Sequence, residues 1–441
     1  MENETLKIFL IIFWICCFSI SYINSRDIAA PVMFFAVALG VFFSDIFVSD
    51  YPIEVVFIYL MLNATVVLTS FIHSRRKAPN SIAAPSASTL AIPYAAVTLW
   101  VLSFPAVMAQ LYFIYLFGGF DSYVIAAQHG TKNFWGMGPL KVLVATFYAI
   151  NLIYFGIFIN SKKTLISLLS FALHFSVFVV LALLTLSRGT LLTQIIFMAL
   201  IYHFSHKKFG LTKVVIGLSV LLTVASIYGA LRESVTWDDR GFQLNYGQTC
   251  STCDQTKTEY YKSEWSYFGL FPLQRVIDAK EINMQFGLTY FTLLTNFIPR
   301  KIWPDKPDPG GVVFTDNYAS EFYDEYSHFA TGLLPEAIIN FGIVGGIIFG
   351  FFLLAILILL LSQHYHKHYA GAASKCVSLK EVRNLVVFCL SIFTFGNILT
   401  SEFTSLFVTL IIKIATIYIS CAVISIFSSK KMKSNIRALK N

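Results

Sequence analysis

Arginines at the ends of apolar stretches are the residues of this chain best suited to chemistry. They are Arg188 in LTLSRGTLL, Arg232 in GALRES, Arg275 in FPLQR, and Arg300, which Lys301 follows. A guanidinium donates in a planar fork that fits two phosphate oxygens at once, and an arginine at the lipid margin usually has an anionic partner. Each could instead be an interfacial anchor whose charged end reaches water, or an ion-pair partner of a nearby carboxylate. As a set they predict a site for an anionic group such as a phosphate.

A proton acceptor for such a site is found farther along the chain. His328, in YSHFATG, is our candidate for a general base, because a neutral imidazole accepts a proton near pH 7. Glu336 follows eight residues later at the start of an apolar run, where it could orient the base or an arginine, or interact with a helix N-terminus. A surface histidine without a chemical role is one alternative. A carboxylate base is the other, and the candidates for it are Asp305, Asp308, Asp316, Glu321 and Glu325.

The residues between Arg300 and Glu336 include a stretch rich in proline and glycine, WPDKPDPGG at 303–311. Because proline fixes φ at three places, we expect a rigid, irregular loop that shapes a site. Stiffening of an exposed loop is the alternative. Farther on, Gly342, Gly346 and Gly350 recur at every fourth residue, which is typical of close helix packing.

The elements that position these residues are apolar helices. Of the 441 residues 56% are hydrophobic and 13% charged, whereas a soluble chain has about 25% charged residues. Only helices satisfy their own backbone polar groups in lipid, so apolar runs near 20 residues predict an all-α polytopic membrane protein of about 11 spans (between ten and twelve). The expected spans are 6–23, 28–48, 53–72, 90–117, 139–160, 164–186, 189–204, 214–231, 334–362, 384–400 and 404–427.

The distribution of charge orients these spans. Basic residues gather in the short loops and in the C-terminal tail, whereas the stretch from Arg232 to Glu336 holds 15 acidic and 9 basic residues. Since cytoplasmic loops carry the excess of Lys and Arg, the C-terminus is predicted to be cytoplasmic and that stretch external. The net charge of +8 is therefore a topology signal, and it does not point to nucleic acid.

We expect a single integral membrane domain, 1–441, with one large external loop region at 232–333. Within that region, the patches 265–273 and 282–299 are too short or too interrupted to be clear spans. We interpret them as interfacial or re-entrant segments. Cys250 and Cys253 of the CSTC sequence lie in the same region, where an oxidising compartment would favour a small disulfide.

Several classes of protein lack support in the sequence. The chain has no P-loop, no dinucleotide-binding glycine motif and no HExxH, and CSTC has no second ligand pair for zinc. A pump driven by ATP and a membrane metalloprotease are therefore poor interpretations. We expect no metal and no cofactor.

The segment IPRKIWPDKPDPGG at 298–311, followed by GLLPEAIINFGIVGG at 332–346, resembles the Wzy-type oligosaccharide repeat-unit polymerases, the O-antigen polymerases of bacteria. That family tends to show PR-x-x-W-P-x-K-P, then a Glu and N-F-G-x-x-G, as at Glu336 and at 340–342. Ser-Arg-Gly at 187–189 also fits, and ten residues separate Arg300 from Gly311 as in the family's Arg-x10-Gly pattern. A second copy of that pattern is not found, since the nearest one, from Arg275, is one residue too long.

The resemblance implies a glycosyltransferase of the membrane C type that acts at the periplasmic face of the bacterial inner membrane. Its substrates would be oligosaccharides linked to undecaprenyl pyrophosphate, and it would need neither a nucleotide sugar nor a metal. A chain-length-regulating co-polymerase would be its partner. Arg300 and Lys301, with Arg188, Arg232 and Arg275, would then bind the pyrophosphate or the glycan. His328 would be the base, with Glu336 beside it.

Two other functions stay open. An O-antigen ligase uses the same lipid-linked donor and has a similar architecture. A polysaccharide flippase or other transporter would show evenly short loops and pseudo-repeats. This chain instead has one polar external region of about a hundred residues.

Overall fold

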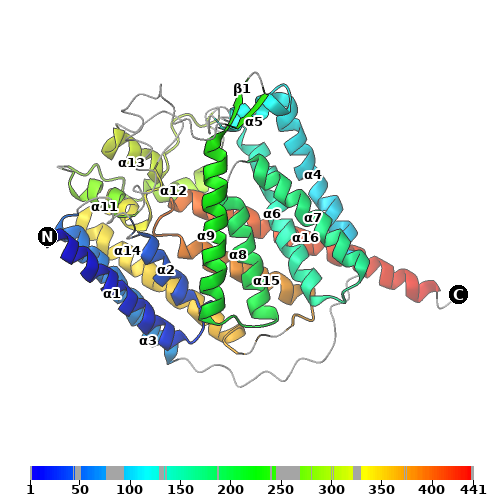
Figure 1. Ribbon diagram of the computed structural model, residues 1–441, viewed down its shortest axis with the longest axis horizontal. Coiled ribbons are helices and arrows are strands. Elements are labelled where there is room, and N and C mark those ends of the chain that lie inside the picture. Colours follow the sequence, from blue (N-terminus) through cyan, green and yellow to red (C-terminus); the bar gives the residue numbers. More distant parts are fainter. Residues whose placement is uncertain are drawn as a thin grey trace. The chain divides into compact units, whose positions relative to one another are not determined.

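In a computed structural model of the chain, the described residues are 2–42, 44, 51–75, 94–128, 134, 137–185, 188–238, 241–244, 269–279, 281–298, 300, 302–320, 329–371, 373 and 375–438. They fold almost entirely as helices, in two compact units (Figure 1). Unit 1 comprises 1–80, 250–371 and 391–410, and unit 2 comprises 81–249, 372–390 and 411–441. Both units contain long apolar helices, so the division runs through the membrane-type part of the chain.

Unit 1 is built on long helices from both ends of the sequence. Its helices are α1 (Glu2–Ser25), α2 (Pro31–Phe42), α3 (Ile53–Ser74), α11 (Leu270–Ile277), α12 (Leu288–Thr295), α13 (Gly310–Tyr318) and α14 (Leu333–His368). α1 packs on α2 and α3, and α14 packs on α2 and α3 (blue and yellow in Figure 1). The Tyr365 hydroxyl donates to the buried carboxylate of Asp27 at 2.7 Å, which ties the end of α14 to the α1–α2 connection.

Unit 2 holds the middle of the chain. Its elements are α4 (Ala95–Leu116), α5 (Phe120–Gln128), α6 (Gly138–Asn160), α7 (Leu165–Leu184), α8 (Arg188–Ser205), α9 (Leu211–Ser234), β1 (Val235–Asp238) and β2 (Gly241–Leu244). The two strands form an antiparallel hairpin in which Val235 lies opposite Leu244. α15 (Leu379–Gly396) and α16 (Phe403–Ala438) each belong partly to both units.

Seven of the described helices are long and apolar enough to cross a membrane. They are Glu4–Ser25, Ile53–Ser74, Ala95–Leu116, Gly138–Asn160, Leu165–Leu184, Leu333–His368 and Phe403–Ser428. Three shorter apolar helices are Pro31–Phe42, Gly189–Ser205 and Leu211–Leu221. The chain therefore has the helices of a polytopic membrane protein. Some of the eleven predicted runs form helices below spanning length or extend beyond the described residues.

α14 differs from the single span expected at 334–362, because its backbone reverses at Gly342, where φ is 73° and ψ is 173°. A Cβ on Gly346 would lie 2.4 Å from Cα of Ile338, and one on Gly350 would lie 2.4 Å from Cδ2 of Leu334. These two contacts place the first segment antiparallel to the second. The packing role predicted for Gly346 and Gly350 is confirmed, whereas Gly342 supplies the positive φ that the reversal needs. Residues 343–368 still extend about 39 Å at 1.5 Å per residue, enough to cross the hydrocarbon.

Candidate functional site

The proline-rich loop of unit 1 is held together by Arg300. Its guanidinium donates to the backbone carbonyls of Pro304 and Lys306, at 3.1 and 3.3 Å, and pairs with the carboxylate of Asp308. Arg300 is nevertheless exposed, so the same fork faces solvent. The rigid loop predicted from the prolines is thus cross-linked by one side chain.

Lys306 ties this loop to α12. Its ammonium donates to the carbonyl of Ile298 at 2.8 Å and to that of Thr295 at 3.4 Å. Cations at a helix C-terminus satisfy such carbonyl groups and interact favourably with the helix dipole. Burial lowers the pKa of Lys306, and the Arg300 charge acts in the same direction, while Asp308 raises it. The loop therefore presents two cations close together.

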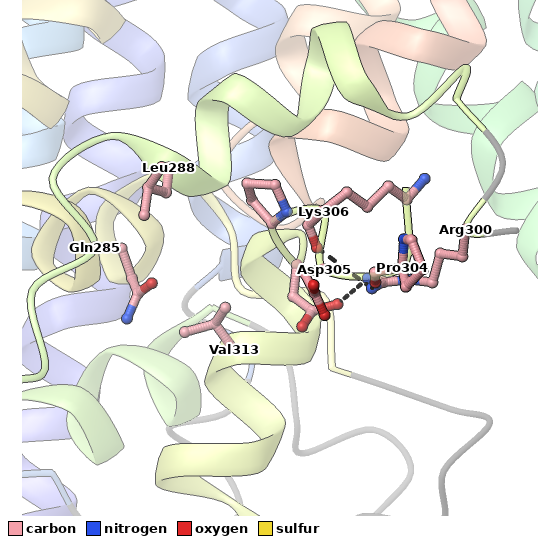
Figure 2. Close-up of a pocket in the computed structure, with 9 residues that line it drawn as sticks. Gln285, Leu288, Arg300, Pro304, Asp305, Lys306 and Val313 are labelled. Carbon is pink, nitrogen blue, oxygen red and sulfur yellow. Dashed lines mark hydrogen bonds and ion pairs between the residues drawn. The ribbon is translucent and has the colours of Figure 1, made fainter. Parts of the chain in front are cut away.

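A polar pocket of about 480 Å³ opens beside the loop. Figure 2 shows its charged residues gathered near Arg300, with Gln285 and Leu288 on the other side. Two cations and two carboxylates therefore line one cavity. Its walls are formed by Gln285, Leu288, Arg300, Pro304, Asp305, Lys306, Pro307, Asp308 and Val313.

Glu336 lies at the centre of a buried polar cluster in the same unit. It is fully buried in the first turn of α14. The Thr289 hydroxyl donates to one carboxylate oxygen at 2.9 Å, and the Phe403 N–H donates to the other at 3.2 Å. Thr331 adds a long contact at 3.5 Å. A buried carboxylate with several donors is held in a fixed orientation, so Glu336 is better suited to position groups than to move.

A second carboxylate, Glu402, joins this cluster through the start of α13. The Gly311 N–H donates to its Oε1 at 3.2 Å. A Cβ on Gly310 would lie 2.5 Å from Cδ of Glu336, and a Cβ on Gly311 would lie 2.6 Å from the Phe329 carbonyl oxygen. A side chain at either position would displace a neighbour, the Glu336 carboxylate at Gly310 and the Phe329 backbone at Gly311.

The reversal in α14 is stabilised by the segment before α12. The N–H groups of Gln285 and Phe286 donate to the carbonyls of Ile339 and Asn340, both at 3.0 Å. The Asn340 side chain accepts from the Gly287 N–H at 2.9 Å, and it donates to the Thr289 hydroxyl at 2.7 Å. The Asn-Phe-Gly sequence therefore ends one helix, turns the chain and connects it to the Glu336 cluster.

The pocket and the carboxylate cluster are neighbours in unit 1, since α12 and α13 contribute to both. Leu288 and Val313 line the pocket, whereas Thr289 and the start of α13 contact Glu336 and Glu402. An anion held by the cations would thus lie in the pocket, with a fixed carboxylate pair behind its wall.

The other predicted site residues have varied positions. Arg275 lies in α11 with its guanidinium carbon 5.1 Å from the centre of the Phe271 ring. Arg188 begins α8 and Arg232 lies in the last turn of α9, both in unit 2, and their side chains are outside the described part. Lys301 and His328 also fall outside the described residues, as do Cys250 and Cys253.

Sequence reasoning missed Glu402. It lies between the last two apolar runs, in a turn that the predicted topology places on the external side, and that position is the signal that would have identified it. Among the described residues, no group of three His, Cys, Asp or Glu side chains is placed to hold a metal ion.

Comparison of the chain with protein-family models, with curated proteins and with solved structures gave no match. The interpretation of the site thus depends on its own geometry and on the motifs in the sequence.

Proposed function

We propose that this chain is a membrane glycosyltransferase. It would join oligosaccharide repeat units carried on undecaprenyl pyrophosphate into a surface polysaccharide of the O-antigen or capsule type. The observation that carries the proposal is the pocket lined by Arg300 and Lys306, whose wall helices α12 and α13 also contact the buried Glu336 cluster. Residues 298–311 and 332–346, which resemble the Wzy-type polymerases, contribute both parts.

In the proposed reaction, a sugar hydroxyl of one repeat unit attacks the anomeric carbon of the growing glycan. The bond from that carbon to the pyrophosphate oxygen breaks, and the lipid pyrophosphate leaves with the electron pair. Cations that meet the leaving group lower the barrier, because negative charge builds up on its oxygens. Arg300 and Lys306 supply this charge in the proposal, with Arg188, Arg232, Arg275 and Lys301 as further cations.

Asp308 has a specific part in this scheme. Its carboxylate accepts from one guanidinium nitrogen of Arg300, and a phosphate oxygen can accept from the same nitrogen. Pyrophosphate would therefore take the position of Asp308 on Arg300. Arg300 would thus pair with Asp308 when the substrate is absent and with pyrophosphate when the substrate is bound.

The attacking hydroxyl needs a base. His328 is the proposed base, and Glu402, which is only partly buried, is the carboxylate alternative. Glu336 is a positioning residue, because its oxygens are already engaged by Thr289 and by the Phe403 N–H.

A second candidate function is transport of the lipid-linked unit. The reversal of α14 at Gly342 favours it, because helices broken within a membrane segment are typical of substrate sites in transporters. The two functions predict different products, so one experiment separates them.

The experiment is deletion of the gene in its native host and analysis of the surface glycan. Loss of a polymerase leaves single repeat units on the lipid core, whereas loss of a flippase strands units on the cytoplasmic side. Loss of a ligase leaves polymer on the undecaprenyl carrier. Purified protein in lipid vesicles should also convert lipid-linked units into longer lipid-linked glycans without a nucleotide sugar. Absence of this elongation with active, well-folded protein would overturn the proposal.

The site must also face the periplasm. A cysteine introduced at Asp316, in α13, should react with a membrane-impermeant maleimide added to intact cells from which the outer membrane has been stripped. A cysteine at Lys163 should react only after lysis. Protection of position 316 until lysis would place the pocket on the wrong side of the membrane.

A further inference from the structure

α12 is amphipathic, but it buries its polar face and exposes its apolar face. This is the reverse of a helix on the surface of a water-soluble protein. Its hydroxyl-bearing residues Thr289, Thr292 and Thr295 are all buried, at 3% exposure or less. Its apolar residues Leu288, Phe291 and Leu294 are exposed, with Leu294 at 68%. A short helix in water buries its apolar face, so this arrangement requires an apolar surrounding.

The buried face of α12 is engaged inside unit 1. The Thr292 and Thr404 hydroxyls lie 2.6 Å apart, and the Thr404 hydroxyl donates to the Thr289 carbonyl at 3.2 Å. Thr289 also bonds Glu336 and Asn340. These contacts fix the rotation of the helix about its axis, so the apolar face cannot turn inward.

The exposed apolar surface extends beyond α12 in both directions along the chain. Phe286 precedes the helix and is 77% exposed, while Phe297 and Ile302 follow it and are also exposed. Arg300, Trp303 and Lys306 border its C-terminal end, and aromatic and basic residues of this kind are typical of the boundary between lipid and water. We define the outward apolar face as residues 286, 291, 294 and 297.

This face continues onto a helix that is long enough to cross the membrane. The Tyr290 ring lies 6.2 Å from that of Phe341 and 5.7 Å from that of Phe349, so α12 packs beside the outer turns of α14. Phe349 is about 10 Å along the helix from the reversal at Gly342. α14 exposes Val344, Ile348 and Phe352 in the same stretch. α12 thus lies alongside a membrane-type segment.

We infer that the outward apolar face is embedded in the hydrocarbon of the bilayer, so that 284–298 is a membrane-inserted element that walls the pocket from lipid. The occupant of this face is lipid acyl chain. Three observations favour lipid over water. The threonines of α12 face inward, the apolar face continues onto α14, and charged residues and a tryptophan border it. The inference does not rest on the proposed reaction, since it concerns the surroundings of α12 alone.

The test places a nitroxide side chain at one position of the full chain in lipid vesicles, through a noncanonical amino acid that leaves the native cysteines in place. Positions 291 and 294 report on the face. Position 348 in α14 is the lipid reference, and position 305, on the exposed loop, is the water reference. Collision rates with oxygen and with a water-soluble nickel chelate are measured at each position.

The labels at 291 and 294 should match the label at 348, with frequent oxygen collisions and rare nickel collisions. Frequent nickel collisions, as at 305, would overturn the inference because the face would be in water. Low rates with both reagents would also overturn it, because protein would then cover the face.

A second measurement does not depend on labelling. Leu294→Met should leave the midpoint of thermal unfolding in lipid vesicles unchanged, whereas Leu294→Asp should lower it, since a charge is disfavoured in hydrocarbon. Equal midpoints for the two variants would contradict lipid contact at this position.

Discussion

Both units bury a cluster of polar side chains. We call the unit 2 cluster closed, because its side chains bond one another, and the unit 1 cluster open, because it shares helices with the polar pocket. In unit 2, His174 bonds Ser103 at 2.9 Å and Asn151 at 2.9 Å, and Gln194 donates to Asn151 at 3.0 Å. Because the Asn151 oxygen accepts from Gln194, its amide nitrogen must donate to Nδ1 of His174. Nε2 of the imidazole then donates to the Ser103 hydroxyl.

The cluster of unit 1 is open by comparison. It contains the carboxylates of Glu336 and Glu402, it contacts the backbone of Gly310 and Gly311, and it shares α12 and α13 with a polar pocket. The closed cluster gives four helices a fixed packing, as buried polar groups do when every bond is made. Because the open cluster shares α12 and α13 with the pocket, a shift of one of its side chains can move the pocket wall. The following predictions test this distinction.

The largest effect is expected at Arg300. If its fork meets the leaving pyrophosphate, Arg300→Ala should lower the rate of glycan elongation by about 10²–10³-fold, the scale of one removed electrostatic donor. Arg300→Lys should recover part of the rate, because an ammonium gives charge without the two-point fork. Elongation by purified protein in vesicles is the measurement, with the amount of protein in the membrane as control. Normal long-chain polymer from well-expressed Arg300→Ala would remove this residue from the site.

Gly310→Ala should have the next largest effect. The added methyl would lie 2.5 Å from Cδ of Glu336, so the carboxylate or the start of α13 must shift. Overpacking of this kind costs about 1–3 kcal/mol of stability, and the shift of Glu336 should lower elongation as well. Thermal unfolding and elongation are both measured.

Gly217→Ala is the matched control, since a Cβ there meets nothing within 4 Å and alanine favours a helix. We expect this variant to be neutral or slightly stabilised. Equal behaviour of the two glycine variants would show that the contact between Gly310 and Glu336 is unimportant.

Much of this architecture follows from the sequence, because length and hydrophobicity alone identify helices that lipid requires. Glu336 and the glycines of 310–311 were also recognised in the sequence as parts of a motif. The reversal at Gly342 was not predicted. The apolar run continues across it, and a hydropathy pattern carries no information about the sign of φ. Glu402 was missed because its contacts are not local, although its place between the last two apolar runs could have identified it. Its partner Gly311 lies 91 residues away in the sequence, so only the folded chain brings them together.

The surroundings of Arg300 were predicted in part. Its charge and its place after Pro299 were visible in the sequence. Its pairing with Asp308 depends on how three prolines bend the intervening loop, and local patterns do not fix that geometry.

The most direct comparison of the two clusters uses the same substitution in each. Asn151 and Asn340 are both fully buried, and each uses its side chain to bond groups from other elements. Asn151→Leu and Asn340→Leu should each cost about 1–3 kcal/mol of stability, the penalty for buried partners left without a bond. Unfolding in lipid vesicles measures this cost. Elongation per folded molecule should stay near that of the native chain for Asn151→Leu, because the bonds that the structure describes around His174 join helices of unit 2. For Asn340→Leu it should fall about tenfold or more, since Thr289 and Gly287 lose the side chain that aligns them with Glu336 and with the pocket wall, and small misplacements in a site are costly. Equal activity per folded molecule in the two variants would mean that the unit 1 cluster is as purely structural as the unit 2 cluster. The chemistry would then have to lie at the arginines alone.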